Sequence, residues 1–161
     1  MVRKRSQPEK MICKNKKAWY NYSIDETYEA GIVLKGSEIK SCRLGKASLK
    51  DGYGRIKNGE IYLINTHISP YAHANRFNHE PLRERKLLLH KREIKRLIGK
   101  INERGMTLIP LGMYLKNGKV KVELGLAKGK RLYDKRESIK RRTEERELER
   151  TLKSSRKLGS L

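Results

Sequence analysis

The sequence predicts a mainly β fold with two helices, followed by a charged tail. Several runs of residues between positions 19 and 128 alternate apolar and polar side chains, which is typical of strands with one buried face. Two Asn-Gly pairs, at 58–59 and 117–118, lie between such runs and are typical of type I′ hairpin turns. Two other segments have helical spacing, and beyond residue 128 the regular hydrophobic pattern stops. A chain of 161 residues is long enough for one domain with a sizeable core.

The net charge indicates a polyanionic partner. Forty Lys and Arg residues against eighteen Asp and Glu residues give a formal net charge of +22, far more than solubility requires. A membrane surface is the competing partner, but the sequence has no long apolar stretch, no N-terminal apolar signal and no lipidation motif. We therefore expect a cytoplasmic protein that binds nucleic acid. Cys13 and Cys42 form no CxxC pair and are expected to be free, reduced thiols.

Residues 1–18 are expected to form a flexible basic arm. They contain seven Lys or Arg residues, a single acidic residue, Glu9, and almost no hydrophobic pattern. Such an arm can reach phosphate groups but cannot fold alone.

The first part of the core is expected to hold a strand, a short helix and a hairpin. Apolar and polar side chains alternate from residue 20, and the strand continues to about residue 34. A short helix follows over 37–44, with Ser37 in the N-cap position and Gly45 just past its end. Residues 55–64 then form two strands around the first Asn-Gly pair.

The second part is expected to hold a long helix and another hairpin. Between Pro81 and Gly105, apolar side chains recur at spacings of three and four, which predicts one helix whose other face is rich in Lys and Arg. The apolar residues assigned to this helix are Leu87, Leu88, Ile94, Leu97, Ile98 and Ile101. Residues 106–128 form the second hairpin, and Pro110 is expected at an edge or a bulge because it cannot donate a hydrogen bond.

This order of elements matches the oligonucleotide-binding (OB) barrel, whose exposed sheet face and loops bind nucleic acid. Five strands, joined mostly as hairpins, carry the long helix between the third strand and the fourth. A ferredoxin-like sandwich is the alternative, but it needs a long first crossover, for which the helix at 37–44 is short. The expected organisation is an arm (1–18), an OB-like RNA-binding barrel (19–128) and a tail (129–161).

No catalytic or metal-binding pattern is found in the sequence. His67, His73 and His79 fall in or near a loop before the long helix, and like His90 they lack HExxH spacing or an accompanying acid. We expect them to be structural or to contact RNA. The tyrosines offer rings on which bases can stack, although in a barrel most of them pack against the core or its rim. We expect no enzyme activity and no cofactor.

The tail, residues 129–161, contains twelve Lys or Arg residues and six acidic residues, with few large apolar side chains. Arg142, Arg146 and Arg150 recur at spacings of four and would form a basic stripe on a helix. One interpretation is a solvated, disordered tail. The other is a tail that is disordered when free and folds into a helix when RNA neutralises the stripe.

Four stretches resemble sequences of a known family. They are "NKKAWYNYSIDETYEAGIVLKGSEIKSCRLGKASLKDGY", "HISPYAHAN", "RERKLLLHKREIKRLIGKINERGMTLIPL" and "GLAKGKRLYDKRE". They resemble the small protein B family, the partners of transfer-messenger RNA in bacterial ribosome rescue. The resemblance covers nearly the whole chain. It implies a barrel that binds the elbow of the tRNA-like domain and a C-terminal tail that enters the empty messenger channel of a stalled ribosome.

The resemblance also implies the site residues. Asn15, Glu29, Leu88 and His90 fall on positions that match the RNA-binding set of the family. With the neighbouring cations and one aromatic ring, the expected contacts to the tRNA-like domain are Asn15, Lys16, Lys17, Tyr22, Glu29, Arg85, Lys86, Leu88, His90 and Lys128. The expected contacts of the tail in the decoding centre and elsewhere on the ribosome are Tyr133, Asp134, Lys135, Arg136, Arg142, Arg146 and Arg150.

The implied partners of this chain, expected to be a monomer, are transfer-messenger RNA (SsrA), 16S rRNA in the ribosome, and elongation factor Tu through the aminoacylated RNA. Two rival functions stay open. A ribosomal or initiation-type protein of the same barrel class would bind rRNA without a rescue role. A small RNA-modifying enzyme would turn over a substrate.

Overall fold

The structure, a computed structural model, describes residues 10–158, and the side chains of residues 10–153. The chain divides into two compact units, the first ending at Lys128 and the second beginning at Gly129. Each unit is described by itself below.

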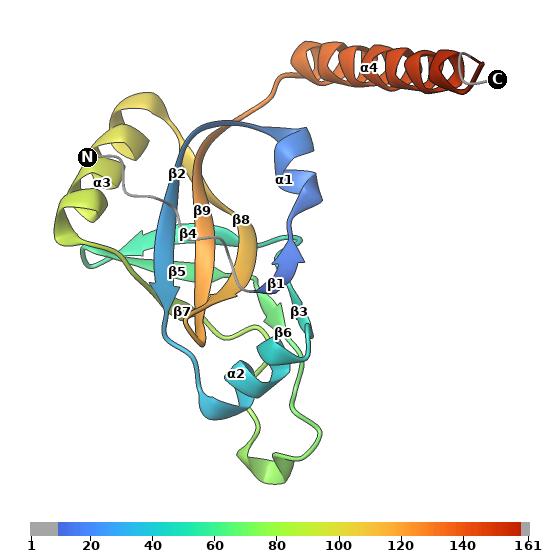
Figure 1. Ribbon diagram of the computed structural model, residues 1–161. Helices are drawn as coiled ribbons and strands as arrows, with labels where there is room; N and C mark the ends of the chain where they lie inside the picture. The colour runs from blue at the N-terminus through green and yellow to red at the C-terminus, as the bar shows by residue number, and fades with distance from the viewer. Residues whose placement is uncertain (1–9, 159–161) are drawn as a thin grey trace. The chain divides into compact units, whose positions relative to one another are not determined.

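The first unit is built on one antiparallel sheet of seven strands (Figure 1). The strands are β1 (Lys10–Lys14), β2 (Tyr22–Ile32), β4 (Tyr53–Lys57), β5 (Glu60–Ile64), β7 (Arg85–Leu88), β8 (Thr107–Lys116) and β9 (Lys119–Gly129). Their order is β1-β8-β4-β5-β7-β2-β9, and β9 pairs with β8 as well, so the sheet curves into a near-closed ring. A second, two-stranded sheet joins β3 (Ala47–Ser48) to β6 (His67–Ile68).

Short helices lie at opposite ends of this unit, α1 (Lys16–Asn21) at one end and α2 (Gly36–Arg43) at the other (Figure 1). The longer helix α3 (Lys91–Arg104) packs on the core through Leu97, which is fully buried, and through Ile94 and Ile101. Burying one leucine side chain stabilises the fold by about 1.5–3 kcal/mol. The opposite face of α3 is charged, so the helix is amphipathic, as the sequence predicted.

Both Asn-Gly hairpins are confirmed. Asn58 and Gly59 have φ of 52° and 72°, and Asn117 and Gly118 have φ of 51° and 69°, which are the left-handed conformations that a type I′ turn requires. Pro110 pairs with Leu124 on β9, and the register shifts immediately after it, so the predicted bulge is present.

The expected arm is wrong from Lys10 onward. Residues 10–14 form β1, which pairs with β8, and residues 16–21 form α1, so Trp19 and Tyr20 lie in a helix and not in the first long strand. Residues 1–9 of the expected arm lie outside the described part of the chain. The strand forms in spite of its charge because the neighbouring edge of β8 offers a hydrogen-bonding partner that the sequence pattern does not show.

The predicted start of the long helix is also wrong. Residues 85–88 form β7, in which Arg85 and Leu87 are buried while Lys86 and Leu88 point outward, a period of two and not of 3.6. The helix begins only at Lys91 and ends, as predicted, at Gly105, whose φ is 58°. The short helix also begins differently, because its N-cap is Lys35 and not Ser37, and the Glu38 carboxylate accepts a hydrogen bond from the Lys35 amide.

The mainly β class with helices is confirmed, but the described residues contain nine strands and not five. The additional strands are short or lie in segments assigned to the arm and the helix. The ferredoxin-like alternative does not fit, because the observed elements do not follow a βαββαβ order.

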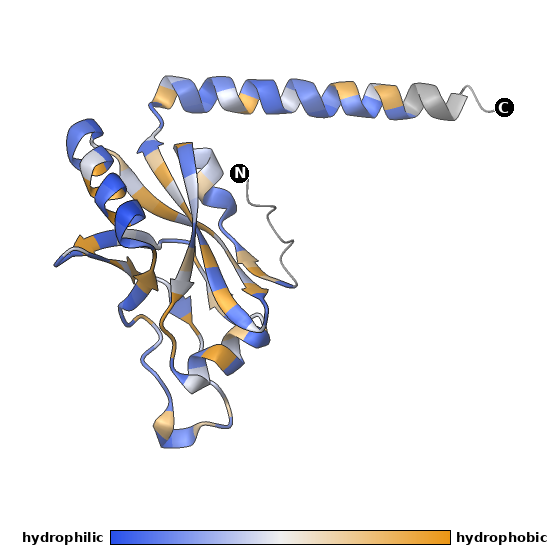
Figure 2. Cartoon of the chain, turned by 60° about the vertical axis from the view of Figure 1, so that its left-hand side comes forward, coloured by the Kyte–Doolittle hydropathy of each residue, from blue (hydrophilic) through white to orange (hydrophobic). Residues whose placement is uncertain are grey.

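The second unit contains one helix, α4 (Leu132–Leu158). Polar residues dominate its length and its apolar positions are scattered, as Figure 2 shows. Asp134 accepts a hydrogen bond from the Arg131 amide at the start of the helix, and Arg141 and Glu145 form one i,i+4 ion pair at 3.5 Å. An i,i+4 ion pair of this kind stabilises a helix by only tenths of a kcal/mol.

Candidate nucleic-acid interface

The outer face of β2 and β7 brings together residues that lie far apart in the sequence. Glu29 and Gly31 flank the buried Ala30 and therefore both point outward. Gly31 pairs with Leu88 of β7, and a Cβ atom at Gly31 would lie 3.2 Å from the Leu88 Cβ. The missing side chain leaves Leu88 uncovered, at 51% exposure. We call Glu29, Lys86, Leu88 and His90 the outer face.

Glu29 is held in place by two residues of β8. Its carboxylate accepts a hydrogen bond of 2.7 Å from the Tyr114 hydroxyl and two, of 2.8 and 3.0 Å, from the Lys116 ammonium. The hydrogen bond from Lys116 has the largest effect on the pKa of Glu29 and lowers it. The hydrogen bond from Tyr114 lowers it further, and together they outweigh the desolvation that would raise it. The carboxylate is therefore ionised at neutral pH, and with 41% of its side chain exposed it can still accept hydrogen bonds from a ligand.

Lys86 and His90 extend the outer face along and beyond β7. The Lys86 ammonium lies 2.5 Å from the Glu60 carboxylate, and this hydrogen bond raises the pKa of Lys86 and lowers that of Glu60. His90 is exposed and is the N-cap residue of α3, where its amide donates to the Glu93 carboxylate at 3.0 Å. The structure therefore gathers four of the ten predicted contacts to the tRNA-like domain on one surface.

Arg85 lies elsewhere, because its side chain points into the interior and is fully buried. Its guanidinium donates to Glu38 at 2.9 Å and to the carbonyl oxygens of Thr66, Arg83 and Pro81 at 2.6, 3.1 and 2.9 Å. Glu38, also fully buried, is bonded to Arg83 as well. Burial lowers the pKa of Arg85, while Glu38 favours its charged form. Arg85 therefore ties three segments of chain together and offers no group to solvent.

Asn15 is likewise part of the framework, at 5% exposure. Its amide nitrogen donates to the carbonyl oxygens of Leu49 and Pro110, both at 3.0 Å, and its side-chain oxygen accepts from the Ala18 amide at 3.2 Å. It is the N-cap of α1 and fixes this helix to β8 and to the loop before β4. All but one of the hydrogen bonds that an asparagine side chain can form are therefore used.

A groove of about 290 Å³ lies beside α1. Its lining includes Asn15, Lys17, Asn21, Tyr22, Lys50 and Tyr53. Lys17 lies 3.9 Å from Asp51, and both side chains are largely exposed. Lys16, the first residue of α1, is exposed but does not line the groove. The structure thus groups Lys17 and Tyr22 at one site. Tyr22 is the first residue of β2, whose residue Glu29, seven positions further on, belongs to the outer face.

The remaining predicted contacts lie at and after the end of β9. Lys128 is exposed, and of the tail residues Tyr133 is 75% exposed. Asp134 caps the start of α4, while Lys135 is half-buried and Arg136, Arg142, Arg146 and Arg150 are exposed along it. Spacings of four place these last three arginines on one side of the helix.

Sequence reasoning missed Gly31, Tyr114 and Lys116. Tyr114 and Lys116 lie 85 and 87 residues from Glu29, so no local pattern connects them. Gly31 carried a signal, because a glycine inside a strand often marks a close approach of another group.

Within residues 10–158, no group of His, Cys, Asp and Glu side chains is arranged to hold a metal ion. Burial raises the pKa of Cys13 to about 11 and that of Cys42 to about 12, so neither thiol is an activated nucleophile. Both cysteines are free, as the sequence predicted. None of the helices in the described segments is long and apolar enough to cross a membrane.

Comparison with known proteins gives consistent matches. The sequence model of a family described as "SmpB protein" matches residues 12–154. An "SsrA-binding protein" of Desulforudis audaxviator is 62% identical over 144 residues, which cover 89% of this chain and 94% of that protein. One of Geobacillus kaustophilus is 58% identical over 149 residues, which cover 92% of this chain and 96% of that protein. A solved structure described as "tmRNA-SmpB: a journey to the center of the bacterial ribosome" matches with a TM-score of 0.63 and 47% identity, over 79% of this chain and 93% of that chain. The chain belongs to the SmpB family.

Proposed function

We propose that this chain is an RNA-binding adaptor in trans-translation, which binds transfer-messenger RNA (SsrA) and delivers it to stalled ribosomes. The observation that carries this proposal is the outer face, where an ionised, fixed carboxylate lies beside an exposed leucine and two basic or polar side chains. Relatives named "SsrA-binding protein" at about 60% identity support the same function. As a member of this family, the chain is an RNA-binding protein and not an enzyme.

The outer face suits an unpaired region of folded RNA better than a regular duplex. A carboxylate repels phosphate but accepts hydrogen bonds from the N–H groups of base edges, which are accessible where bases are unstacked. Leu88 offers an apolar surface next to it for the flat face of a base or a sugar. We infer that Glu29, Leu88 and His90 contact the tRNA-like domain directly, with Lys86 beside them.

The other predicted contacts divide into two roles. Lys17 and Tyr22 line the groove beside α1 together with Lys50, and two cations and a ring suit a phosphate backbone with a neighbouring base. Lys16 is exposed next to Lys17 in the sequence and adds a further positive charge. Asn15 and Arg85 act through the fold, because their side chains are buried and engaged. We infer that their substitution affects RNA binding only by lowering the stability of the fold. Lys128 adds positive charge at the end of β9.

The near-closed sheet, with a helix between β7 and β8, supports an OB-like barrel as its finer classification. The strand pairings alone fit a closed sheet that presents one face and several loops to nucleic acid. The short β3 and β6, and β1 at the edge of β8, are additions to that plan.

We further propose that the tail enters the empty messenger channel of a stalled ribosome. Its exposed Tyr133 offers a ring for stacking, while Lys135 and Arg136 offer charge for 16S rRNA phosphates. The scattered apolar positions of α4 provide no continuous face for packing, and isolated helices without packing are marginally stable. We infer that rRNA phosphates stabilise α4 by neutralising Arg142, Arg146 and Arg150, and that the tail is disordered when free.

The oligomeric state and the further partner follow from the proposed role on the ribosome. The adaptor would act as a monomer on one aminoacylated RNA, which brings elongation factor Tu into the same complex. Its location would then be the bacterial cytoplasm.

Binding of the purified chain to the isolated tRNA-like domain tests the outer face. Leu88→Ala and Glu29→Gln should each reduce affinity about tenfold, while Tm changes by only about 2 °C, because neither side chain is buried. Leu44→Ala, which removes a 60% exposed leucine at the end of α2, and Glu84→Gln are the matched controls. Unchanged affinity in both variants would contradict the proposal. Capture of rRNA in place of transfer-messenger RNA from a bacterial lysate would favour a ribosomal role instead.

A further inference from the structure

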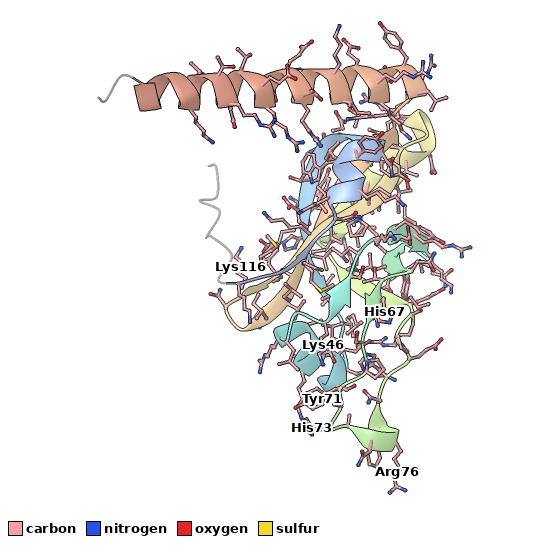
Figure 3. All side chains as sticks on the ribbon, turned by 90° about the vertical axis from the view of Figure 1, so that its right-hand side faces the viewer. Lys46, His67, Tyr71, His73, Arg76 and Lys116 are labelled. Carbon is pink, nitrogen blue, oxygen red and sulfur yellow. The ribbon has the colours of Figure 1, made fainter. Side chains whose placement is uncertain are left out.

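The connection between β6 and β7, residues 69–84, carries a second surface that the function above does not use. It contains the short helical turn η1 (Asn75–Phe77) and lies at the end of the first unit that holds α2 (Figure 1). Figure 3 shows Lys46, His67, Tyr71, His73 and Arg76 at this end. Lys116, which donates hydrogen bonds to Glu29, lies apart from them. The loop surface, as we name it, consists of Lys40, Lys46, Tyr71, His73, Arg76 and Phe77.

This loop is fixed by hydrogen bonds despite its length. The side chain of Asn78 closes it, since its oxygen accepts from the Tyr71 amide at 2.8 Å and its nitrogen donates to the Tyr71 carbonyl at 2.7 Å. His79, at 4% exposure, lies with its ring nitrogens 2.9 Å from the Ser37 hydroxyl and 2.9 Å from the Ile68 carbonyl. The loop therefore presents a defined shape, which reduces the entropic cost of binding a ligand.

The fixed loop presents aromatic rings beside cations. Phe77, at 78% exposure, has the guanidinium of Arg76 5.2 Å from its ring centroid. Tyr71 has the Lys40 ammonium 5.3 Å from its ring centroid, and the ring of His73 meets it edge-on at 5.4 Å. An exposed ring is ordinary by itself. An exposed ring on a fixed loop, with a guanidinium beside it and a second ring with its own cation on the same loop, is suited to stack on a nucleobase and to bind nearby phosphates.

The charge of the loop surface is free to act on a ligand. Among the residues whose side chains are described, no ion pair involves Lys40, Lys46 or Arg76. In the segment from His67 to Glu80, the only acidic residue is the last one, Glu80. Glu38, the acid of α2, is buried and paired with Arg83 and Arg85. The net positive charge at this end is therefore not neutralised within the protein.

We propose that the loop surface is a second RNA-binding site, which takes a single-stranded segment with one unstacked base against Phe77 and its phosphates against Lys40, Lys46 and Arg76. This site is separate from the outer face and does not depend on contacts made there. The segment can belong to the transfer-messenger RNA or to rRNA, because both offer the same chemistry. A site on each of two surfaces would allow the adaptor to contact two RNA segments at once.

The single phenylalanine of the chain makes the site directly observable. Phenylalanine labelled with ¹³C in its ring reports on Phe77 alone in the full-length protein. Titration with a single-stranded heptaribonucleotide should shift these ring resonances upfield, because a stacked base shields the ring. Unchanged ring resonances at a saturating concentration would overturn the proposal.

Affinity measurements then identify the source of the segment. Phe77→Ala and Arg76→Gln should each lower the affinity about fivefold or more, either for the isolated tRNA-like domain or for ribosomes that lack a messenger. Leu82→Ala, which removes a 53% exposed leucine from the same connection, should leave both affinities within about twofold of wild type. The proposal is overturned if neither affinity falls, or if Leu82→Ala lowers them as much. Binding of the labelled protein to anionic vesicles, with the same Phe77 shift and no response to RNA, would also overturn it.

These outcomes are distinct from failure of the proposed function. If Leu88→Ala weakens binding of the tRNA-like domain while Phe77→Ala changes nothing, the adaptor role stands and only the second site fails.

Discussion

Replacement of the buried Arg85 by methionine should destabilise the fold strongly and leave RNA binding by the folded protein nearly unchanged. Methionine fills a similar volume but cannot donate a hydrogen bond. The substitution removes the 2.9 Å hydrogen bond to Glu38 and leaves the carbonyl oxygens of Thr66, Arg83 and Pro81 without this donor. The Arg85 side chain is fully buried, so water cannot readily replace the hydrogen bonds that it makes.

The expected loss is about 3–5 kcal/mol, the usual cost of removing one partner of a buried ion pair. The remaining bonds of Glu38, from Arg83 at 2.5 and 2.8 Å and from the Lys35 amide at 2.6 Å, keep its charge partly compensated. They limit the loss to this range. A loss of this size corresponds to a fall in Tm of roughly 10–20 °C for a domain of this length.

Urea denaturation followed by fluorescence of Trp19, the only tryptophan of the chain, measures the free energy of unfolding. Lys57→Met is the matched control, because Lys57 and Glu84 form an exposed pair at 3.4 Å that should contribute at most about 1 kcal/mol. High salt should leave the difference between wild type and Arg85→Met intact, since buried pairs are screened little. A variant that keeps wild-type stability but loses affinity for the tRNA-like domain would refute the reasoning and make Arg85 a direct RNA contact.

Three further predictions address charge, acid stability and the tail. If about six phosphates are contacted, the logarithm of the RNA affinity should fall against the logarithm of salt concentration with a slope of roughly −4 to −5, and a flat response would contradict an electrostatic interface. The hydrogen bond from Lys100 lowers the pKa of Glu26 from 4.5 to about 2, so this carboxylate stabilises the fold above pH 4.5 and the contribution is lost as the pH falls toward 2. Glu26→Gln should therefore weaken the dependence of the urea midpoint on pH between pH 5 and 2. An unaltered dependence would show that Glu26 does not contribute to acid sensitivity. Truncation after Gly129 should keep affinity for the tRNA-like domain within about tenfold and abolish peptide tagging on stalled ribosomes, and near-normal tagging would remove the proposed role of the tail.

Local chemistry in the sequence was enough to predict several elements. The two Asn-Gly turns, the left-handed Gly105 and the bulge after Pro110 follow from backbone preferences of one or two residues, which hold wherever the segment lies. The net charge of +22 and the quoted stretches were enough to predict an RNA-binding protein of this family. Of the site, Glu29 and Leu88 were predicted, but only by the resemblance.

Tertiary structure alone decided which of the predicted residues face solvent. Arg85 and Lys86 are adjacent cations in the sequence, yet the strand conformation of residues 85–88 sends one inward and the other outward. Asn15 bonds to the carbonyl oxygens of residues 34 and 95 positions away, and Glu29 is fixed by side chains 85 and 87 positions away. The strand β7 itself exists because β5 and β2 each pair with it, although a helical pattern extends over the same residues. Hydrogen bonds between distant segments determine these placements, and no periodicity within a single segment contains them.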